Sequence, residues 1–168
     1  MDFTLQHIVA IVLVLLVGLS AGLCFTWTNA ITPGIGKLDD LGYLRAFQQM
    51  NRSIINPLFI IVFFGPFILG IPNLYLFKNT SSSMIWLLII AMAFYFFGVL
   101  LVTIFGNVPL NELLDKTDLS KASLEDLKLL RNRFETKWNR LHLIRTFSAS
   151  VSFLLLIKSL IQIIKSIT

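Results

Sequence analysis

Four long apolar stretches dominate this chain of 168 residues. They lie near residues 7–28, 54–77, 84–105 and 143–164, and each is close to the roughly 20 residues with which a helix crosses a membrane. Because 56% of the residues are hydrophobic and only 14% are charged, the chain is too apolar for a soluble domain of its size. Helices are favoured because lipid-exposed backbone must satisfy its own hydrogen bonds. The sequence therefore predicts an all-α integral membrane four-helix bundle, formed as one domain over residues 1–168.

A helical pattern leads into the fourth apolar stretch from outside it. From Leu124, apolar residues recur with helical spacing at positions 127, 130, 134, 138 and 141. Ser123 and Asp126 resemble a capping box at the start of this pattern, with Asp where Glu or Gln is usual. An unbroken helix to Ile164 would be about 60 Å long at about 1.5 Å per residue. We therefore expect a long fourth helix whose first third extends out of the bilayer.

Glycine and proline tracts predict where the first and third helices end. The tract Thr32–Gly36 contains Pro33 and two glycines, and we expect it to break the first helix. We expect the third helix to end at Gly106, followed by a loop over residues 107–121 that holds one helical turn near 112–115.

A separate helix is predicted to begin near Asp39, between the first two apolar stretches. One face of it carries Leu41, Leu44, Phe47 and Gln48. A polar line that includes Gln49 and Asn56 approaches the membrane just before Pro57. The second span holds three prolines, which favour kinks that free backbone carbonyls.

Lysine and arginine are distributed unevenly between the two sides of the predicted bundle. Of the 14 cations, all but those at positions 78, 158 and 165 fall in or beside the two long loops, which lie on one side. By the positive-inside rule, the long loops of a multi-pass cell-membrane protein with this pattern face the cytoplasm and both termini face out. Because these cations flank membrane spans, the net charge of +5 does not predict nucleic-acid binding.

The first apolar stretch is expected to be a membrane helix, because it lacks the basic start and cleavage site of a secretory signal peptide. Its Gly18 and Gly22 form a small-residue face on which another helix can pack closely, within the chain or in a homo-oligomer. Its Cys24 is the chain's single cysteine, so no intrachain disulfide is expected, and a buried apolar role is favoured.

Polar residues near the predicted membrane surface gather at the end of the bundle that carries the two long loops. They are Asn29, Gln48, Gln49, Asn51, Asn56, Asn107, Asn111, Trp138, His142 and Arg145. Trp138, His142 and Arg145 are four and three residues apart, which stacks them on one helix face. Each residue also has a structural explanation: the asparagines cap helices, Trp138 anchors at the interface, or Arg145 reaches lipid phosphates. These explanations treat the residues singly, whereas their collection at one end predicts a site.

The residue types at this end suit an organic anion or a polarised carbonyl group. Arg145 would hold negative charge, while Asn107 and Asn111 would donate hydrogen bonds. His142 would accept a proton, because imidazole titrates near neutral pH. The predicted partner is a small apolar or aromatic ligand taken up within the lipid bilayer. Its other predicted contacts are Trp138, Asn56, Gln49, Phe25, Phe105 and Tyr95.

No cofactor motif is evident in the sequence. It has no glycine-rich nucleotide loop, no Ser-His-Asp order and no zinc-type pattern of cysteine and histidine. A bis-histidine haem is poorly supported, because His7 and His142 fall at opposite membrane faces. A metal on His142 lacks a second good ligand. No metal ligand set is therefore predicted, and metal and haem stay open as alternatives.

Several tracts of the chain form a pattern when they are taken together. They are Gly18 to Thr26, Asn56-Pro57, Asn107-Val-Pro-Leu-Asn111, Trp138 and Arg145-Thr146. This pattern, spread over nearly the whole chain, resembles that of the anthrone-oxygenase-like family of four-span membrane proteins. The resemblance implies functional roles for Asn107, Asn111, Trp138 and Arg145. Fungal members are associated with oxidising an anthrone to an anthraquinone with molecular oxygen, without an established cofactor motif. His142 departs from the family pattern, which often has Asn at this position.

Two function hypotheses from different classes follow. The first is a membrane-embedded oxidoreductase or oxygenase that acts on a flat aromatic or quinol-like small molecule by abstracting a proton. The second is a non-catalytic membrane protein that binds a lipid, quinone or haem-like ligand, or serves as an assembly partner. A transporter ranks third, because the chain has no detectable inverted repeat and no charged residue deep in a span.

Overall fold

Helices account for all of the regular secondary structure in residues 4–165, the part of the chain that the computed structural model describes. Seven segments are α-helical and three are π-helical within this part. In chain order they are α1 (Leu5–Thr26), η1 (Trp27–Ile31), α2 (Thr32–Ile35), α3 (Asp40–Ile54), α4 (Pro57–Leu76), α5 (Ser82–Ala93), η2 (Phe94–Leu101), η3 (Thr103–Asn107), α6 (Val108–Asp115) and α7 (Leu124–Lys165).

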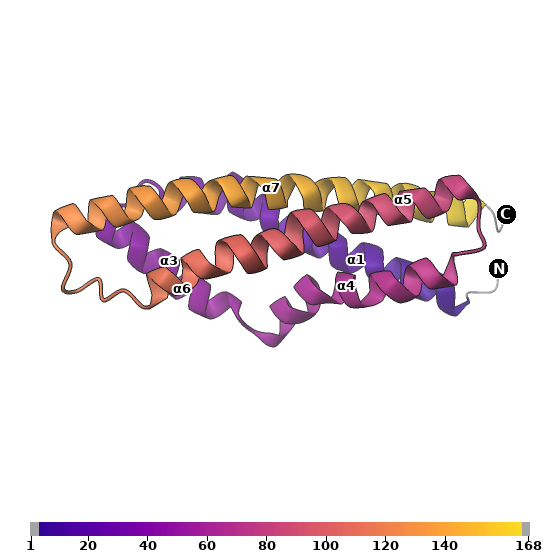
Figure 1. The fold of residues 1–168 in the computed structure, drawn as a ribbon, viewed down its shortest axis with the longest axis horizontal. Coiled ribbons are helices and arrows are strands. Elements are labelled where there is room, and N and C mark those ends of the chain that lie inside the picture. The colour runs from indigo at the N-terminus through magenta and orange to yellow at the C-terminus, as the bar shows by residue number, and fades with distance from the viewer. Residues whose placement is uncertain (1–3, 166–168) are drawn as a thin grey trace.

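The segments form an elongated bundle in which α7 runs the full length (Figure 1). α7 packs against α1 and α5, and α1 also packs against α4. α5, η2, η3 and α6 form one nearly continuous rod beside α7, while α3 lies at the end opposite the start of α1. The prediction of an all-α bundle is confirmed.

Four helical runs within residues 4–165 are long and apolar enough to cross a membrane. They are Leu5–Ile35, Pro57–Leu76, Ser82–Asp115 and Leu124–Lys165. Each overlaps one of the four apolar stretches of the sequence, so the predicted number and order of candidate spans are confirmed. α1 begins at the end of the bundle at which α7 finishes (Figure 1).

The expected break of the first helix at Thr32–Gly36 is wrong, because the helix continues through Pro33 to Ile35. The backbone N–H of Thr32 donates to the carbonyl of Trp27, five residues earlier, which is the π pattern. The Thr32 hydroxyl donates to the same carbonyl at 3.0 Å. Pro33 then lies in the first turn of α2, where its missing N–H costs no helical hydrogen bond.

The third helix also continues beyond its expected end at Gly106. The π-helical segment η3 includes Gly106, and the N–H of Val108 donates to the carbonyl of Thr103. Pro109 lies in the first turn of α6, which extends to Asp115. The predicted loop over residues 107–121 is therefore helical in its first half, and a widened π turn again accommodates the proline.

The long fourth helix is confirmed as α7, an unbroken helix of 42 residues. The predicted capping box is present: Ser123 Oγ donates to Asp126 Oδ2 at 2.6 Å, and the Asp126 N–H donates to Ser123 Oγ at 3.2 Å. The helix predicted near Asp39 is confirmed as α3. Asp39 caps it by accepting a hydrogen bond from the Gly42 N–H at 2.7 Å.

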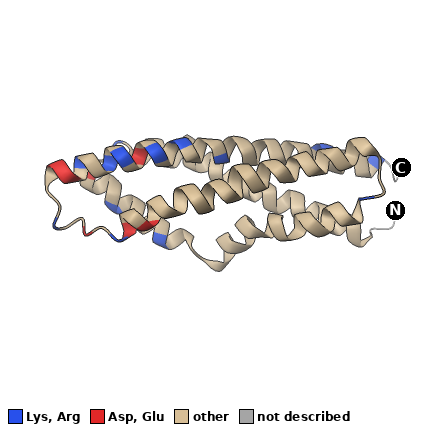
Figure 2. Cartoon of the chain, viewed as in Figure 1, with Lys and Arg blue, Asp and Glu red and all other residues tan. Residues whose placement is uncertain are grey.

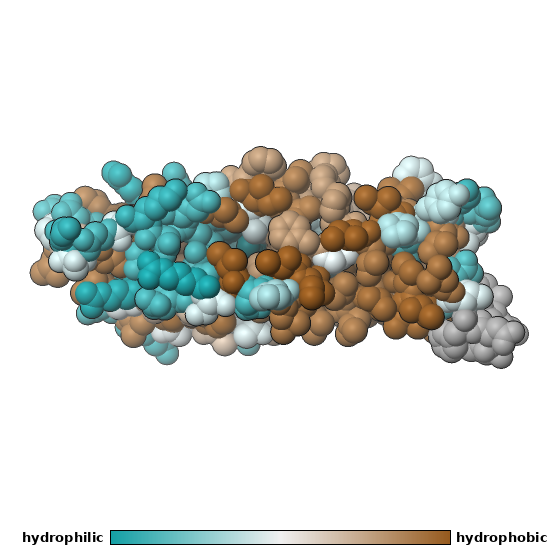
Figure 3. Space-filling model, turned by 90° about the horizontal axis from the view of Figure 1, so that it is seen from below, coloured by the Kyte–Doolittle hydropathy of each residue, from teal (hydrophilic) through white to brown (hydrophobic). Residues whose placement is uncertain are grey.

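Two separate apolar cores hold the bundle together. The first core joins α1, α4, α5 with η2, and α7, and it includes Leu13, Val17, Leu88, Val99 and Leu156. The second core joins α3, α6 and the first half of α7, and it includes Tyr43, Leu44, Phe47, Leu114, Phe134 and Trp138. Most charged residues surround the second core (Figure 2). One face of the molecule shows the same division, teal over the second core and largely brown over the first (Figure 3).

Arg131 ties the second core to the chain between α2 and α3. Its guanidinium donates to the carbonyls of Gly36 and Leu38, both at 2.8 Å. It also pairs with Glu135 at 2.9 Å and Asp40 at 3.1 Å. Every face of this cation therefore has an acceptor, unlike that of the cation in the candidate site described below.

The two glycines of α1 differ in their surroundings. A Cβ atom on Gly18 would come within 2.7 Å of the Phe153 ring of α7, so this glycine permits close packing within the chain. A Cβ on Gly22 would meet no heavy atom within 4 Å among the described residues. A homo-oligomer through this face stays a prediction.

Gly98 provides a test of the packing between η2 and α7. A Cβ at this position would overlap the Ser148 side chain, so the two helices pack closely only because residue 98 is glycine. Gly98→Ala is expected to lower the free energy of unfolding by about 1–3 kcal/mol through overpacking. Thermal unfolding in mild detergent measures this as a lower Tm. Gly22→Ala is the matched control and is expected to leave Tm unchanged; equal Tm values for the two variants would contradict the packing described.

Candidate functional site

A cavity of about 110 Å³ lies between the two cores, where α1, α3, α4, η3, α6 and α7 meet. Most of its wall is apolar, with Trp27, Phe47, Phe59 and Phe63 among the contributors. The polar side chains on the wall are Ser20, Asn51, Thr103, Asn111 and Arg145. An apolar cavity with a few convergent polar groups is the usual form of a small-molecule site.

Arg145 brings a positive charge to this wall. Its Nη1 donates to the Thr103 hydroxyl at 3.2 Å, and its Nη2 donates to His142 Nδ1 at 2.9 Å. Its Nε is buried and has no hydrogen-bond partner among the described residues. No carboxylate of residues 4–165 forms an ion pair with it. A guanidinium in this state is available to a ligand that carries an anionic or strongly polarised oxygen.

His142 holds Arg145 from behind. Because a guanidinium can only donate, His142 Nδ1 accepts from Arg145, and the ring proton resides on Nε2. This Nε2–H donates to the Cys24 carbonyl at 3.0 Å. The imidazole stacks on Trp138 with 4.7 Å between ring centroids, and it is only 2% exposed. Both ring nitrogens therefore have partners within the protein, and the ring does not form part of the cavity wall.

A chain of side-chain hydrogen bonds crosses three helices beside the cavity. The Trp138 indole N–H donates to Asn111 Oδ1 at 2.9 Å. The Asn111 amide in turn donates to Asn51 Oδ1 at 2.8 Å. The Asn51 amide nitrogen ends the chain without a hydrogen-bond acceptor among the described residues. The chain thus leaves a fixed donor group on a wall residue, Asn51.

The predicted site residues separate into a wall and a supporting layer. Arg145, Asn111 and Trp138 line the cavity. Asn107 is completely buried behind them, and its amide donates to the Trp138 carbonyl at 3.4 Å. Asn107 makes no side-chain cap hydrogen bond at the start of α6, so the capping explanation does not apply to it. The structure brings these residues and His142 together, as the sequence predicted.

The other predicted ligand contacts lie away from the cavity wall. Phe25 and Phe105 are 57% and 75% exposed. Gln49 is exposed, because it lies on the outer face of α3. Asn56 caps α4 by accepting from the Phe59 N–H at 3.0 Å. Tyr95 is fully buried, where it donates to the Phe63 carbonyl at 2.8 Å and contacts Ser20. Their predicted roles as ligand contacts are not supported by this arrangement.

Two wall residues were missed in the sequence. Asn51 follows Leu44 and Phe47 at helical spacing, so the buried face predicted for α3 already pointed to it rather than to Gln49. Trp27 was interpretable as an interfacial anchor. It packs instead against Phe47 and Trp138, with ring centroids 5.6 and 5.4 Å apart.

Residues 4–165 contain no group of three or more histidine, cysteine, aspartate or glutamate side chains that could hold a metal ion. His7 lies in the first turn of α1, about 25 Å from Cys24 along the helix axis at about 1.5 Å per residue. His142 contacts Cys24, so the two histidines are too far apart to share one haem iron.

Two arginines of α7 allow the unpaired state of Arg145 to be tested. Arg145→Met removes a poorly compensated cation, and we expect Tm in detergent to stay unchanged or to rise. Arg131→Met is the matched control; it removes the ion pairs and carbonyl contacts of a satisfied guanidinium, and we expect a clear loss of Tm. A larger loss in the Arg145 variant than in the Arg131 variant would contradict this description.

The comparisons with known proteins agree with the pattern of these residues. A family model described as anthrone oxygenase matches residues 53–155, which is more than half of the chain. The match covers Asn107, Asn111, Trp138 and Arg145, whereas Trp27 and Asn51 lie before it. No curated protein and no solved structure matches the chain. On the strength of the family match, the chain belongs to the anthrone oxygenase family.

Proposed function

We propose that this protein is a membrane-embedded oxidoreductase of the oxygenase type that acts on a flat aromatic or quinol-like small molecule. The reacting part of the molecule would bind in the cavity between the two cores. The observation that carries this proposal is the guanidinium of Arg145, which faces an apolar cavity without a carboxylate partner among the described residues. Membership of the anthrone oxygenase family supports the reaction class.

Arg145 would act by stabilising the ionised form of the substrate. Loss of a proton from a carbon next to an aromatic carbonyl gives an enolate, whose charge resides largely on oxygen. Inside an apolar cavity, a fixed cation stabilises such a charge far more than it would in water. The Asn51 amide, held by Asn111, is placed to donate a second hydrogen bond to the same oxygen.

His142 would accept the proton through an exchange of partners. In the structure its Nδ1 is occupied by Arg145 Nη2. When Arg145 turns this N–H onto the substrate oxygen, Nδ1 becomes a free base directly behind the cavity wall. The electron-rich substrate carbon then reacts with molecular oxygen. A CH₂ group becomes C=O, one oxygen atom enters the product, and the other leaves as water with the two hydrogens.

The size of the cavity limits how the substrate binds. A cavity of about 150 Å³ holds benzene, so the 110 Å³ available here would enclose at most about one ring. The remaining rings would extend past Ile54, Ile55 and Phe59, at the corner between α3 and α4. Ile55 is 66% exposed, which gives this corner an apolar surface. A substrate dissolved in the bilayer could approach along it.

This proposal places the cavity at the level of the membrane surface. The first core would lie in the bilayer, whereas α3, α6 and the first third of α7 would stand outside it, where most charges are found (Figure 2). The expectation that this charged end faces the cytoplasm and that both termini face out rests on the positive-inside rule.

A non-catalytic ligand-binding protein is the second candidate. It is favoured by one observation: His142 Nδ1 already has a partner, and none of the polar wall residues is a general base at neutral pH. Such a protein would bind a quinone or a similar flat ligand and leave it unchanged.

Oxygen consumption by the purified protein separates the two candidates. With an anthrone as probe in mild detergent, the proposal predicts oxygen uptake together with the quinone absorbance, above the rate of the probe alone. Arg145→Gln is expected to lower kcat/KM by about 10²–10³, the usual effect of removing a charge-stabilising donor. Arg45→Gln, which removes an exposed cation of α3, is the matched control and is expected to keep full activity. Probe binding without oxygen uptake would favour the second candidate.

A further inference from the structure

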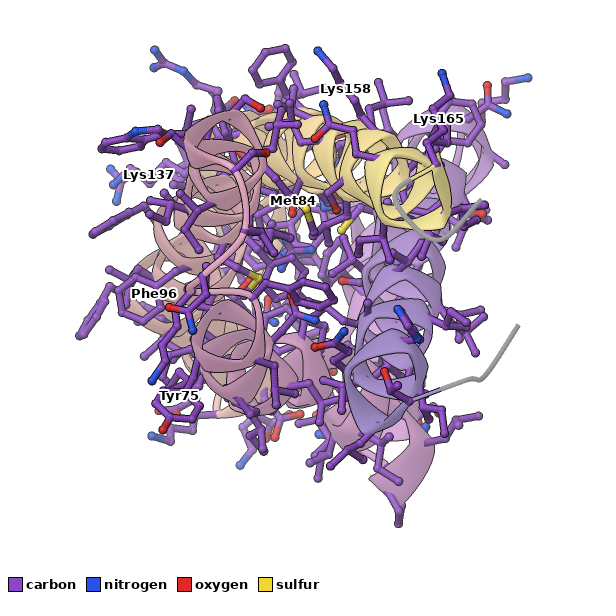
Figure 4. All side chains as sticks on the ribbon, turned by 90° about the vertical axis from the view of Figure 1, so that its right-hand side faces the viewer. Tyr75, Met84, Phe96, Lys137, Lys158 and Lys165 are labelled. Atoms are coloured by element: carbon purple, nitrogen blue, oxygen red, sulfur yellow. The ribbon has the colours of Figure 1, made fainter. Side chains whose placement is uncertain are left out.

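A shallow groove follows the outer side of the bundle between α6 and α7, away from the cavity. One wall is formed by Phe105, Gly106, Pro109 and Leu110. The other wall is formed by Lys137, Arg140, Leu141 and Ile144 of α7. Lys137 projects outward from the bundle in the view along its axis (Figure 4). The groove therefore combines an apolar floor with two cations along one edge.

The cations on this edge lack the carboxylate partners that other basic residues at this end possess. Lys137 and Arg140 are exposed, and no ion pair to either occurs among residues 4–165. Arg133, one turn before Lys137, extends the row in the same state. By contrast, Arg52 pairs with Asp115, and Lys116 with Glu112. A row of unpaired cations is a surface that attracts a bound anion.

The acidic residue on the continuation of the groove does not neutralise this row. Asp126 lines the adjoining stretch, but its carboxylate accepts from Ser123 in the capping box. It lies eleven positions before Lys137 in the same helix, about 16 Å away at about 1.5 Å per residue. The region around Lys137 and Arg140 therefore keeps its positive charge.

The order of residues along α7 matches the order of groups in a phospholipid. Lys137 and Arg140 come one to two turns before the apolar run that begins near Leu143. Beyond them the groove is apolar, with Phe105 75% exposed and Ile144 49% exposed. Cations at the end of a membrane helix lie at the depth of lipid headgroups, and exposed apolar side chains below them lie at the depth of acyl chains.

We propose that this groove is a binding site for an anionic phospholipid. The lipid phosphate would pair with Arg140, whose guanidinium can donate two parallel hydrogen bonds, and with Lys137 as a second charge. An acyl chain would pack on Phe105 and Ile144. This site is separate from the cavity that holds Arg145 and stands whether or not the protein is an oxygenase.

Native mass spectrometry of the detergent-purified protein, titrated with phosphatidylglycerol or phosphatidylcholine, tests the site. We expect at least fivefold tighter binding of phosphatidylglycerol, and the loss of this preference in the double variant Lys137→Gln/Arg140→Gln. The matched control Lys116→Gln/Lys121→Gln removes the same charge at the same end but from carboxylate-paired lysines, and is expected to keep the preference. Equal loss in both double variants would overturn the site in favour of general charge attraction.

Two further arms keep the proposal falsifiable. Leu110→Trp fills the groove while every cation stays in place, and we expect it to weaken phosphatidylglycerol binding by a similar factor. This variant decides the matter if the double variant does not fold. Inorganic phosphate alone is expected not to displace the lipid at an equal phosphate concentration. Full displacement would mean that the groove binds free anions, and would overturn the lipid assignment.

Discussion

The contact of Arg145 with His142 joins three parts of the bundle at one point. Arg145 and His142 belong to α7, the Cys24 carbonyl that receives the imidazole N–H belongs to α1, and Thr103 opens η3. Because a guanidinium only donates hydrogen bonds, its presence fixes the proton on the far nitrogen of His142, and this nitrogen then requires an acceptor on α1. A cation without a carboxylate is costly to bury, so the arrangement is better explained by ligand binding than by stability.

The π-helical segments explain how the polar groups converge on the cavity. A π turn holds one more residue than an α turn, and it changes the direction in which the following side chains point. Trp27 opens η1, while Thr103 opens η3 and Asn107 ends it. All three either line the cavity or support its wall. π-helical insertions are frequent at functional sites in other proteins, and here two of them border the same cavity.

The fold could be predicted from the sequence further than the site could. The apolar runs and the capping box at Ser123 led directly to the four long helices, because hydrophobic periodicity and caps act locally. Pro33 and Pro109 misled, since a proline that starts a new turn after a π segment resembles one that ends a helix. Within the site, the spacing of Trp138, His142 and Arg145 was informative. Which nitrogen of His142 is free, and whether Asn51 or Gln49 faces inward, depends on contacts between helices that no local pattern encodes.

The central claim is that Arg145 stabilises the ionised form of a flat ligand inside the cavity. The ultraviolet–visible spectrum of an anthrone bound anaerobically to the purified protein tests it most directly, because the keto and enolate forms absorb at different wavelengths. The account predicts the enolate spectrum at neutral pH with the wild-type protein and the keto spectrum with Arg145→Met. A bound ligand that shows the keto spectrum in both proteins would contradict it.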